Sequence, residues 1–128
     1  MTLLRFEVGL VSADRALVDF LAEVFELEPL PPLTAGPGVL HRLQLPGDAV
    51  LKVMVPNDPP AATDASGPFF AVTGIRYLTL WVDDLDGVIE RATARNGRVQ
   101  HGPAQLAPGV RIAVLQDPDG NAIEVVER

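Results

Sequence analysis

The chain has 128 residues, 48% of them hydrophobic, which suffices for one folded domain with a core of its own. A formal net charge of −7 offers no basic stripe for nucleic acid, and the absence of cysteine excludes disulfides, thiolate metal sites and a thiol nucleophile. Since no apolar run reaches the length of a membrane span and no signal-peptide pattern opens the chain, we expect a soluble cytoplasmic protein.

The first half of the chain predicts a strand, a helix and a hairpin. Residues 4–11 alternate between apolar and other side chains, as in a strand. Ser12 and Asp14 can each cap the amphipathic helix that follows, whose apolar face runs from Leu17 to Phe25. Prolines end this helix, an extended stretch reaches about Val39, and a hairpin then turns at Pro46-Gly47-Asp48.

The second half repeats this order. A strand from about Ile75 to Val82 leads to a helix capped by Asp83 or Asp84, and Asn96-Gly97 stops the helix. Residues 98–101 predict a short strand broken by Gly102-Pro103. The chain closes with a hairpin around Asp117-Pro118-Asp119-Gly120, where Pro118 presets φ and Gly120 accepts a positive φ.

Two tandem βαβββ modules are therefore predicted, about 70 residues apart, in an α+β fold. The first module covers residues 1–56 and the second 75–128, with a linker over residues 57–74 that is rich in Pro and Ala and contains Asp, Thr and Gly. Within the linker, Phe69 and Phe70 either fill a gap between the halves, which we favour, or cover a pocket as a lid.

Strand parity places a mixed set of side chains on the face that points away from each helix. In the first module these are Arg5, Glu7, Gly9, Arg42, Gln44, Val50, Lys52 and Met54, with Arg42 opposite Lys52. In the second they are Tyr77, Thr79, Trp81, Arg111, Ala113, Leu115, Ala122, Glu124 and Val126. Aromatic side chains with a few convergent polar groups indicate a small-molecule pocket. The candidate ligand-binding residues are Trp81, Thr79, Arg42, Arg111, Gln44 and Met54.

Other roles remain open for some of these residues. Trp81 can instead fill the cleft or form a dimer contact. His41 shares the parity of the apolar residues on the helix side, and His101 lies in a short strand, so a structural or solvent-facing role is favoured for both.

The doubled plan, the segment Tyr77–Asp86 and the closing segment Asp117–Glu124 together resemble the vicinal oxygen chelate superfamily. This superfamily includes glyoxalase I, the extradiol dioxygenases and the bleomycin-resistance proteins. The resemblance implies two modules that curl their sheets around a concave cleft. In metal-binding members the ligands, mostly His and Glu, come from the first and last strands of each module. Carried onto this chain, those positions are Glu7, Lys52, Tyr77 and Glu124.

This set of residues argues against a metal cofactor. Glu7 and Glu124 could bind a divalent ion and would be the ligands if one were present. A neutral Tyr77 phenol is a poor ligand, and the Lys52 ammonium has three donors, no lone pair and a repelling charge. Glu7, Lys52 and Glu124 could instead form a salt-bridged cluster, either as a staple between the modules or as a substrate-contacting site.

The sequence is consistent with two functions. The first is a metal-independent small-molecule binder of the bleomycin-resistance kind, with its pocket between the modules and acting as a homodimer. The alternative is a glyoxalase-type lyase, isomerase or dioxygenase, in which Glu124 or Glu7 would act as a base and Lys52 or Tyr77 would stabilise an oxyanion. The residues leave catalysis and the identity of the ligand open.

Overall fold

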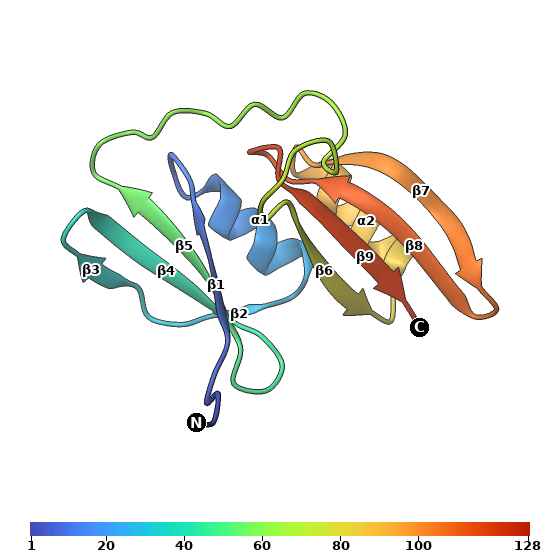
Figure 1. The fold of residues 1–128 in the computed structure, drawn as a ribbon, viewed down its shortest axis with the longest axis horizontal. Helices are drawn as coiled ribbons and strands as arrows, with labels where there is room; N and C mark the ends of the chain where they lie inside the picture. The colour runs from blue at the N-terminus through green and yellow to red at the C-terminus, as the bar shows by residue number, and fades with distance from the viewer. The chain divides into compact units, whose positions relative to one another are not determined.

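The computed structural model describes all of residues 1–128 and forms two compact units, Met1–Ala61 and Ala62–Arg128. The predicted α+β class is confirmed, because the chain folds into two helices with one five-stranded and one four-stranded sheet (Figure 1). Neither helix is long and apolar enough to span a bilayer.

The first unit pairs its first and last strands in parallel. Its elements are β1 (Glu7–Val11), α1 (Ala16–Val24), β2 (Glu28–Pro29), β3 (Leu33–Ala35), β4 (Gly38–Gln44) and β5 (Val50–Pro56). The sheet order is β1-β5-β4-β2, and β3 also pairs with β4. Two short strands thus stand where one is expected, because Pro29, Pro31 and Pro32 lack the N–H groups that a continuous ladder needs.

The second unit repeats the same plan. Its elements are β6 (Tyr77–Val82), α2 (Leu85–Ala94), β7 (Arg98–Ala107), β8 (Val110–Gln116) and β9 (Ala122–Glu127), in the sheet order β6-β9-β8-β7. The strand β6 runs parallel to β9, as β1 does to β5. The expectation that β7 would break at Gly102-Pro103 is wrong: irregularities in the β7–β8 register around His101 absorb these residues and the strand continues.

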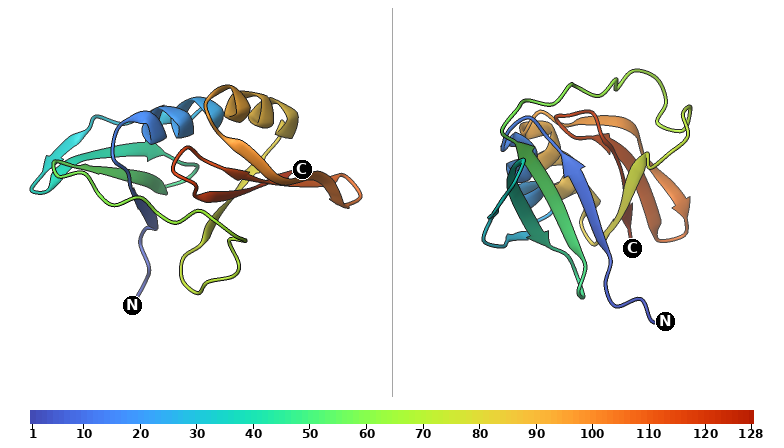
Figure 2. Two further views of the ribbon diagram at one scale, coloured as in Figure 1. Left: turned by 90° about the horizontal axis from the view of Figure 1, so that it is seen from above. Right: turned by 60° about the vertical axis from the view of Figure 1, so that its left-hand side comes forward.

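A helix lies against one face of the sheet within each unit (Figure 2). In the first unit, the most deeply buried helix residues are Leu17, Phe20, Leu21 and Val24, and the matching strand residues include Leu43, Leu51 and Val53. In the second, they are Leu85, Val88 and Ala92 with Leu115, Ile123 and Val125. The alternate strand residues therefore point to the opposite face of each sheet, which we call the open face of that unit.

The predicted cap of α2 and the terminal turn form as expected, but the caps predicted for α1 do not. Asp84 caps α2 by accepting a hydrogen bond from the Gly87 amide at 2.9 Å. The N-cap position of α1 is Arg15, which makes no side-chain cap hydrogen bond, and Asp14 before it accepts from the Ala16 amide at 2.8 Å. In the terminal hairpin, the Gly120 amide donates to the Asp117 carbonyl at 2.9 Å, and Gly120 has a φ of 87°. Local turn chemistry thus fixes where β8 ends and β9 begins.

Candidate functional site

The open face of the first unit carries Glu7, Arg42, Gln44, Val50, Lys52 and Met54. The register pairs Arg42 with Lys52 and Gln44 with Val50 across the β4–β5 hairpin, and Glu7 with Val50 across β1–β5. The predicted placement of Arg42 opposite Lys52 is therefore confirmed. His41 pairs with Val53 on the helix side, also as expected, and burial lowers the pKa of its imidazole.

An ion pair joins two of the four positions that the sequence singled out. The Lys52 Nζ lies 3.1 Å from the Glu7 Oε2, and the two side chains are 31% and 26% exposed. The other Glu7 oxygen, Oε1, accepts from the Arg5 Nε at 3.0 Å. Hydrogen bonds from Arg5 first, and from Lys52 second, lower the pKa of Glu7. Glu7 thus stays ionised, with both oxygens engaged by cations.

The neighbouring polar residues of this face hold loops in place. The Arg42 guanidinium donates to the Pro31 carbonyl at 3.0 Å. The Gln44 Nε2 donates to the carbonyls of Leu45, Gly47 and Ala49 at 2.9–3.2 Å. A ligand-binding role for Arg42 and Gln44 stays a prediction, and a ligand would have to compete with these contacts.

The open face of the second unit carries two exposed aromatic rings on one strand. Tyr77, Thr79 and Trp81 are alternate residues of β6, and Glu124 of β9 lies beside Thr79 in the register. The Thr79 Oγ1 donates to the Glu124 Oε1 at 3.0 Å. Tyr77 is 50% and Trp81 59% exposed. A hydroxyl–carboxylate pair therefore lies between two aromatic side chains that can contact a ligand.

Each of these two rings already has one neighbour within the unit. The Phe69 ring meets Tyr77 edge-on, with 5.0 Å between their centroids. The Arg128 guanidinium carbon lies 5.3 Å from the centre of the Trp81 ring, as in a cation–π contact. The indole thus attracts a cation in this structure.

The prediction that Arg111 shares the open face with Glu124 is wrong. Gln116 pairs with Ala122 across the turn, so Val114 lies opposite Glu124, whereas Arg111 lies opposite Glu127. Arg111, Ala113 and Leu115 consequently point to the helix side, since a one-residue difference in register reverses every side chain. The Arg111 guanidinium bonds Glu127 at 2.9 Å and Asp86 at 3.1 Å, which ties α2 to β8 and β9. Ile112, Val114 and Gln116 take the open face instead.

The donor set of the first unit does not suit a divalent metal ion. Lys52 offers an ammonium without a lone pair, and Glu7 is already bound by two cations. The structure contains no group of three or more His, Asp or Glu side chains placed to hold a metal ion. His101 is exposed on β7. The joining of Glu124 to the Lys52–Glu7 pair stays a prediction.

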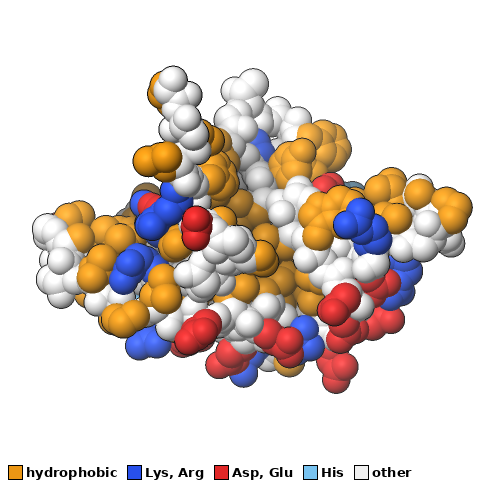
Figure 3. All heavy atoms as spheres, turned by 90° about the horizontal axis from the view of Figure 1, so that it is seen from below, with side chains coloured by type: hydrophobic (Ala, Val, Ile, Leu, Met, Phe, Trp, Pro, Cys, Tyr) orange, Lys and Arg blue, Asp and Glu red, His pale blue; other side chains and the backbone are white.

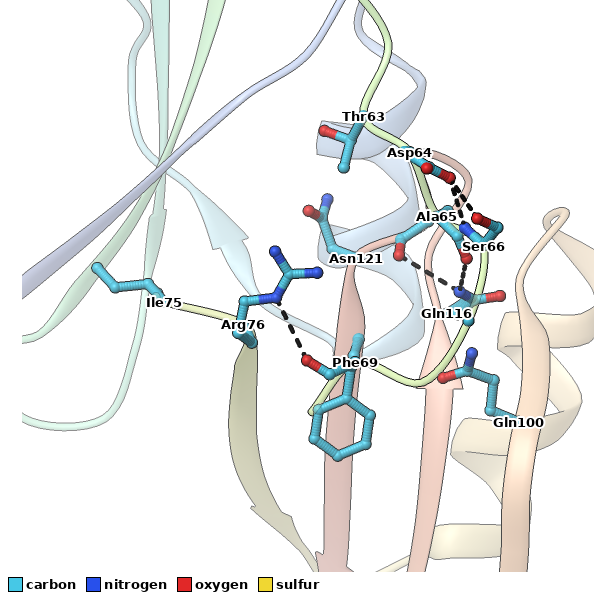
Figure 4. Close-up of a pocket in the computed structure, with 13 residues that line it drawn as sticks. Thr63, Asp64, Ala65, Ser66, Phe69, Ile75, Arg76, Gln100, Gln116 and Asn121 are labelled. Carbon is cyan, nitrogen blue, oxygen red and sulfur yellow. Dashed lines mark hydrogen bonds between the residues drawn. The ribbon is translucent and has the colours of Figure 1, made fainter. Parts of the chain in front are cut away.

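The second unit also holds a cavity of about 250 Å³ that the sequence did not indicate (Figure 4). Its walls include Asp64 and Phe69 of the loop that precedes β6, Arg76, Gln100 of β7, Gln116 and Asn121. None of the predicted site residues lines it. Of the two linker aromatics considered as a pocket lid, Phe69 lines this cavity and Phe70 does not. The linker has no periodicity from which its folding against a sheet can be inferred.

Hydrophobic side chains are exposed among charged ones on the surface (Figure 3). The exposed set includes Phe6, Val11, Phe70, Val72, Ile75 and Leu106. Apolar surface of this kind accompanies sites for ligands or partners as well as ordinary protein surface.

The comparisons with known proteins found a matching family model and similar solved structures. The model of the Glyoxalase/Bleomycin resistance protein/Dioxygenase superfamily matches residues 11–125. No curated protein matches the sequence. A glyoxalase family protein from Bacillus cereus is similar in structure, with a TM-score of 0.78 and 18% identity over 99% of this chain and 95% of that one.

Two further solved structures are similar to this chain. TnmS3, an antibiotic binding protein from Streptomyces sp. CB03234, has a TM-score of 0.64 and 26% identity over 99% of this chain and 95% of its own. Glyoxalase I from Zea mays has a TM-score of 0.76 and 18% identity over 95% of this chain, but only 43% of its own length is covered.

Proposed function

The chain belongs to the glyoxalase/bleomycin resistance protein/dioxygenase superfamily, and from this membership we propose that it binds a small molecule without a metal ion. The observation that carries the proposal is the Lys52–Glu7 ion pair. It puts an ammonium group, 3.1 Å from a carboxylate oxygen, at a strand position that the family resemblance assigns to a metal ligand. The Lys52 ammonium group thus occupies a position at which a metal-binding site would need a ligand, and its positive charge repels a metal ion.

The open face of the second unit supports an aromatic ligand. Trp81 and Tyr77 offer exposed rings on either side of Thr79 and Glu124, and the Trp81 ring already attracts the Arg128 cation. The net charge of −7 favours a cationic ligand over an anionic one. The likeness to TnmS3, an antibiotic binding protein, supports an antibiotic-like molecule as the ligand class. The proposal includes assembly into a homodimer and a location in the cytoplasm. Size-exclusion chromatography with light scattering tests the homodimer.

Trp81 provides a direct test, because it is the only tryptophan in the chain. We expect 9-aminoacridine, a planar cation, to quench the Trp81 emission saturably, and acridine-9-carboxylate, a planar anion of similar shape, to quench it far less. Glu124→Gln should weaken 9-aminoacridine binding about two- to fivefold, the range of a partly exposed ion pair. The absence of saturable quenching, or equal quenching by both compounds, would contradict binding at this face.

Divalent ions test the metal-independence. A metal ion raises the Tm of a protein when it binds the native state and not the unfolded state. Since we propose that the native state has no metal site, we expect Mn²⁺, Ni²⁺, Zn²⁺ and Fe²⁺ to leave the Tm unchanged. Lys52→His should create or strengthen affinity for these ions, whereas Lys52→Met, which removes the same charge without adding a ligand, should not. If a divalent ion raises the Tm of the unaltered protein by several degrees and Glu124→Ala abolishes that rise, the proposal is wrong.

A further inference from the structure

The cavity of about 250 Å³ is built from the second unit alone. The loop from Thr63 to Phe69 crosses over the end of the sheet where β8 stops and β9 starts (Figure 4). The Ala65 carbonyl accepts from the Gln116 Nε2 at 3.4 Å, and the Phe69 carbonyl accepts from the Arg76 Nε at 3.3 Å. The Phe69 ring also meets Tyr77 of β6. The loop thus partly covers a space with polar walls.

Arg76 brings an unneutralised positive charge to this cavity. Its side chain is half-buried and uses only the Nε as a donor, and it makes no ion pair with an acidic residue. The terminal nitrogens of the guanidinium extend toward Asn121 in Figure 4. The acidic residue of the wall, Asp64, accepts from the amide and hydroxyl of Ser66 at 2.9 and 2.6 Å. A free guanidinium fork matches a carboxylate, which it binds through two parallel hydrogen bonds.

Gln100 brings an unused acceptor. Its Oε1 is buried and has no hydrogen-bond partner. The adjacent amide of Gln116 is already committed, because its Oε1 accepts from Arg98 at 2.5 Å and its Nε2 faces the carbonyls of Ala65 and Gly120. A buried acceptor costs free energy until a donor reaches it, so Gln100 is the position where an N–H or O–H of a ligand would be most favourable.

The two groups approach the cavity from opposite edges of the sheet. Arg76 directly precedes β6 and Gln100 belongs to β7, and the order β6-β9-β8-β7 separates these strands by three spacings, or about 14 Å between their axes. Both long side chains reach inward, so a ligand would meet one at each end. The cavity volume equals about eight water molecules at roughly 30 Å³ each, which limits the occupant to a compound of about that many non-hydrogen atoms.

We propose that this cavity binds a small elongated carboxylate that carries an N–H or O–H donor at the end opposite the carboxylate. Arg76 holds the carboxylate, and the Gln100 Oε1 accepts from the distal donor. The site is separate from Trp81 and does not depend on the function proposed above.

Three matched compounds test the ligand class by isothermal titration calorimetry at low salt. The compound 6-hydroxyhexanoate has both groups, hexanoate lacks the donor and 1,6-hexanediol lacks the carboxylate. We expect 6-hydroxyhexanoate to bind at least about tenfold more tightly than either of the others, because each missing group leaves a buried partner unpaired. Equal binding of all three, or binding of none, would overturn the proposal.

Variants then assign the two contacts. Arg76→Gln should weaken 6-hydroxyhexanoate binding at least about tenfold, and Arg128→Gln, which removes the same charge from the same unit outside the cavity, should not change it. Arg76→Lys keeps the charge but also loses the bond to the Phe69 carbonyl, so it should bind better than Arg76→Gln. If it binds no better, the charge is not what holds the ligand.

Gln100→Leu should abolish the preference for 6-hydroxyhexanoate over hexanoate while leaving hexanoate binding intact. A preference that survives this substitution would contradict the role of Gln100. Trp81→Phe should bind all three compounds as the unaltered protein does, so a failure of this proposal and a failure of acridine quenching are separate results.

Discussion

Gly120→Ala is expected to lower the free energy of unfolding by about 3 kcal/mol and to lift the loop at Ala65 away from the terminal hairpin. Two effects add at this position. Gly120 has a φ of 87°, a conformation that residues with a Cβ rarely adopt. A Cβ there would also lie 2.3 Å from the Cβ of Ala65, so the loop would have to move. Because that loop forms a wall of the cavity, the same substitution should abolish binding of 6-hydroxyhexanoate.

Gly109→Ala is the matched control for this substitution. Gly109 lies in the turn between β7 and β8 with a φ of 74°, and nothing lies within 4 Å of a Cβ built on it. Gly109→Ala should therefore lower the free energy of unfolding only through its unfavourable backbone conformation, by about 1–2 kcal/mol. Urea unfolding of both variants isolates the collision with Ala65 as the difference. If both variants lose the same stability, the loop does not pack on the turn as the structure has it.

The repeated plan could be predicted because its signals are local. Asp84 caps a helix through its own side chain, and Gly120 permits the turn whatever surrounds it, so sequence chemistry alone locates these boundaries. The Lys52–Glu7 pair could also be predicted. Alternation puts Glu7 of β1 and Lys52 of β5 on the same face of the sheet once β1 pairs in parallel with β5.

The orientation of Arg111 and the cavity depend on contacts between distant segments, which the sequence of a single segment does not reveal. Residues 112–115 of β8 are apolar on both faces, so alternation could not decide which way Arg111 points, and the face assigned to it was wrong. The cavity requires the linker to fold against β8 through the Ala65 carbonyl and against β6 through the Phe69 ring, which meets Tyr77. Those contacts join residues up to 51 positions apart, and neither composition nor periodicity encodes them.

Asp117→Asn is expected to remove a pH dependence of stability that amounts to about 3 kcal/mol. Burial raises the pKa of Asp117 from 3.8 to about 6, against hydrogen bonds from Asn121 and Asp119 that lower it. The folded state thus holds a proton on this group that the unfolded chain releases between pH 4 and 6. Its contribution to stability is fully present below pH 4 and is lost as the pH rises through 6.

The substitution keeps the turn while removing the titration. The Asp117 Oδ1 accepts from the amides of Asp119 and Asn121, both at 2.9 Å, and an asparagine Oδ1 can do the same. The Oδ2 accepts from the Asn121 Nδ2 at 2.8 Å, and rotation of that amide restores a pairing with the new donor. Relative to the unaltered protein, Asp117→Asn should therefore gain stability from pH 4 to about 6 and then level off.

Only the difference between variants isolates Asp117, because other carboxylates act in the opposite direction. The pKa values of Glu7 and Glu127 are lowered, mainly by Arg5 and Arg111, so these groups add stability as the pH rises through their ordinary range. Urea unfolding of Asp117→Asn and of the unaltered protein at pH 4, 5, 6 and 7 measures this difference. A constant offset between Asp117→Asn and the unaltered protein over that range would mean that the three hydrogen bonds outweigh burial and keep Asp117 ionised throughout.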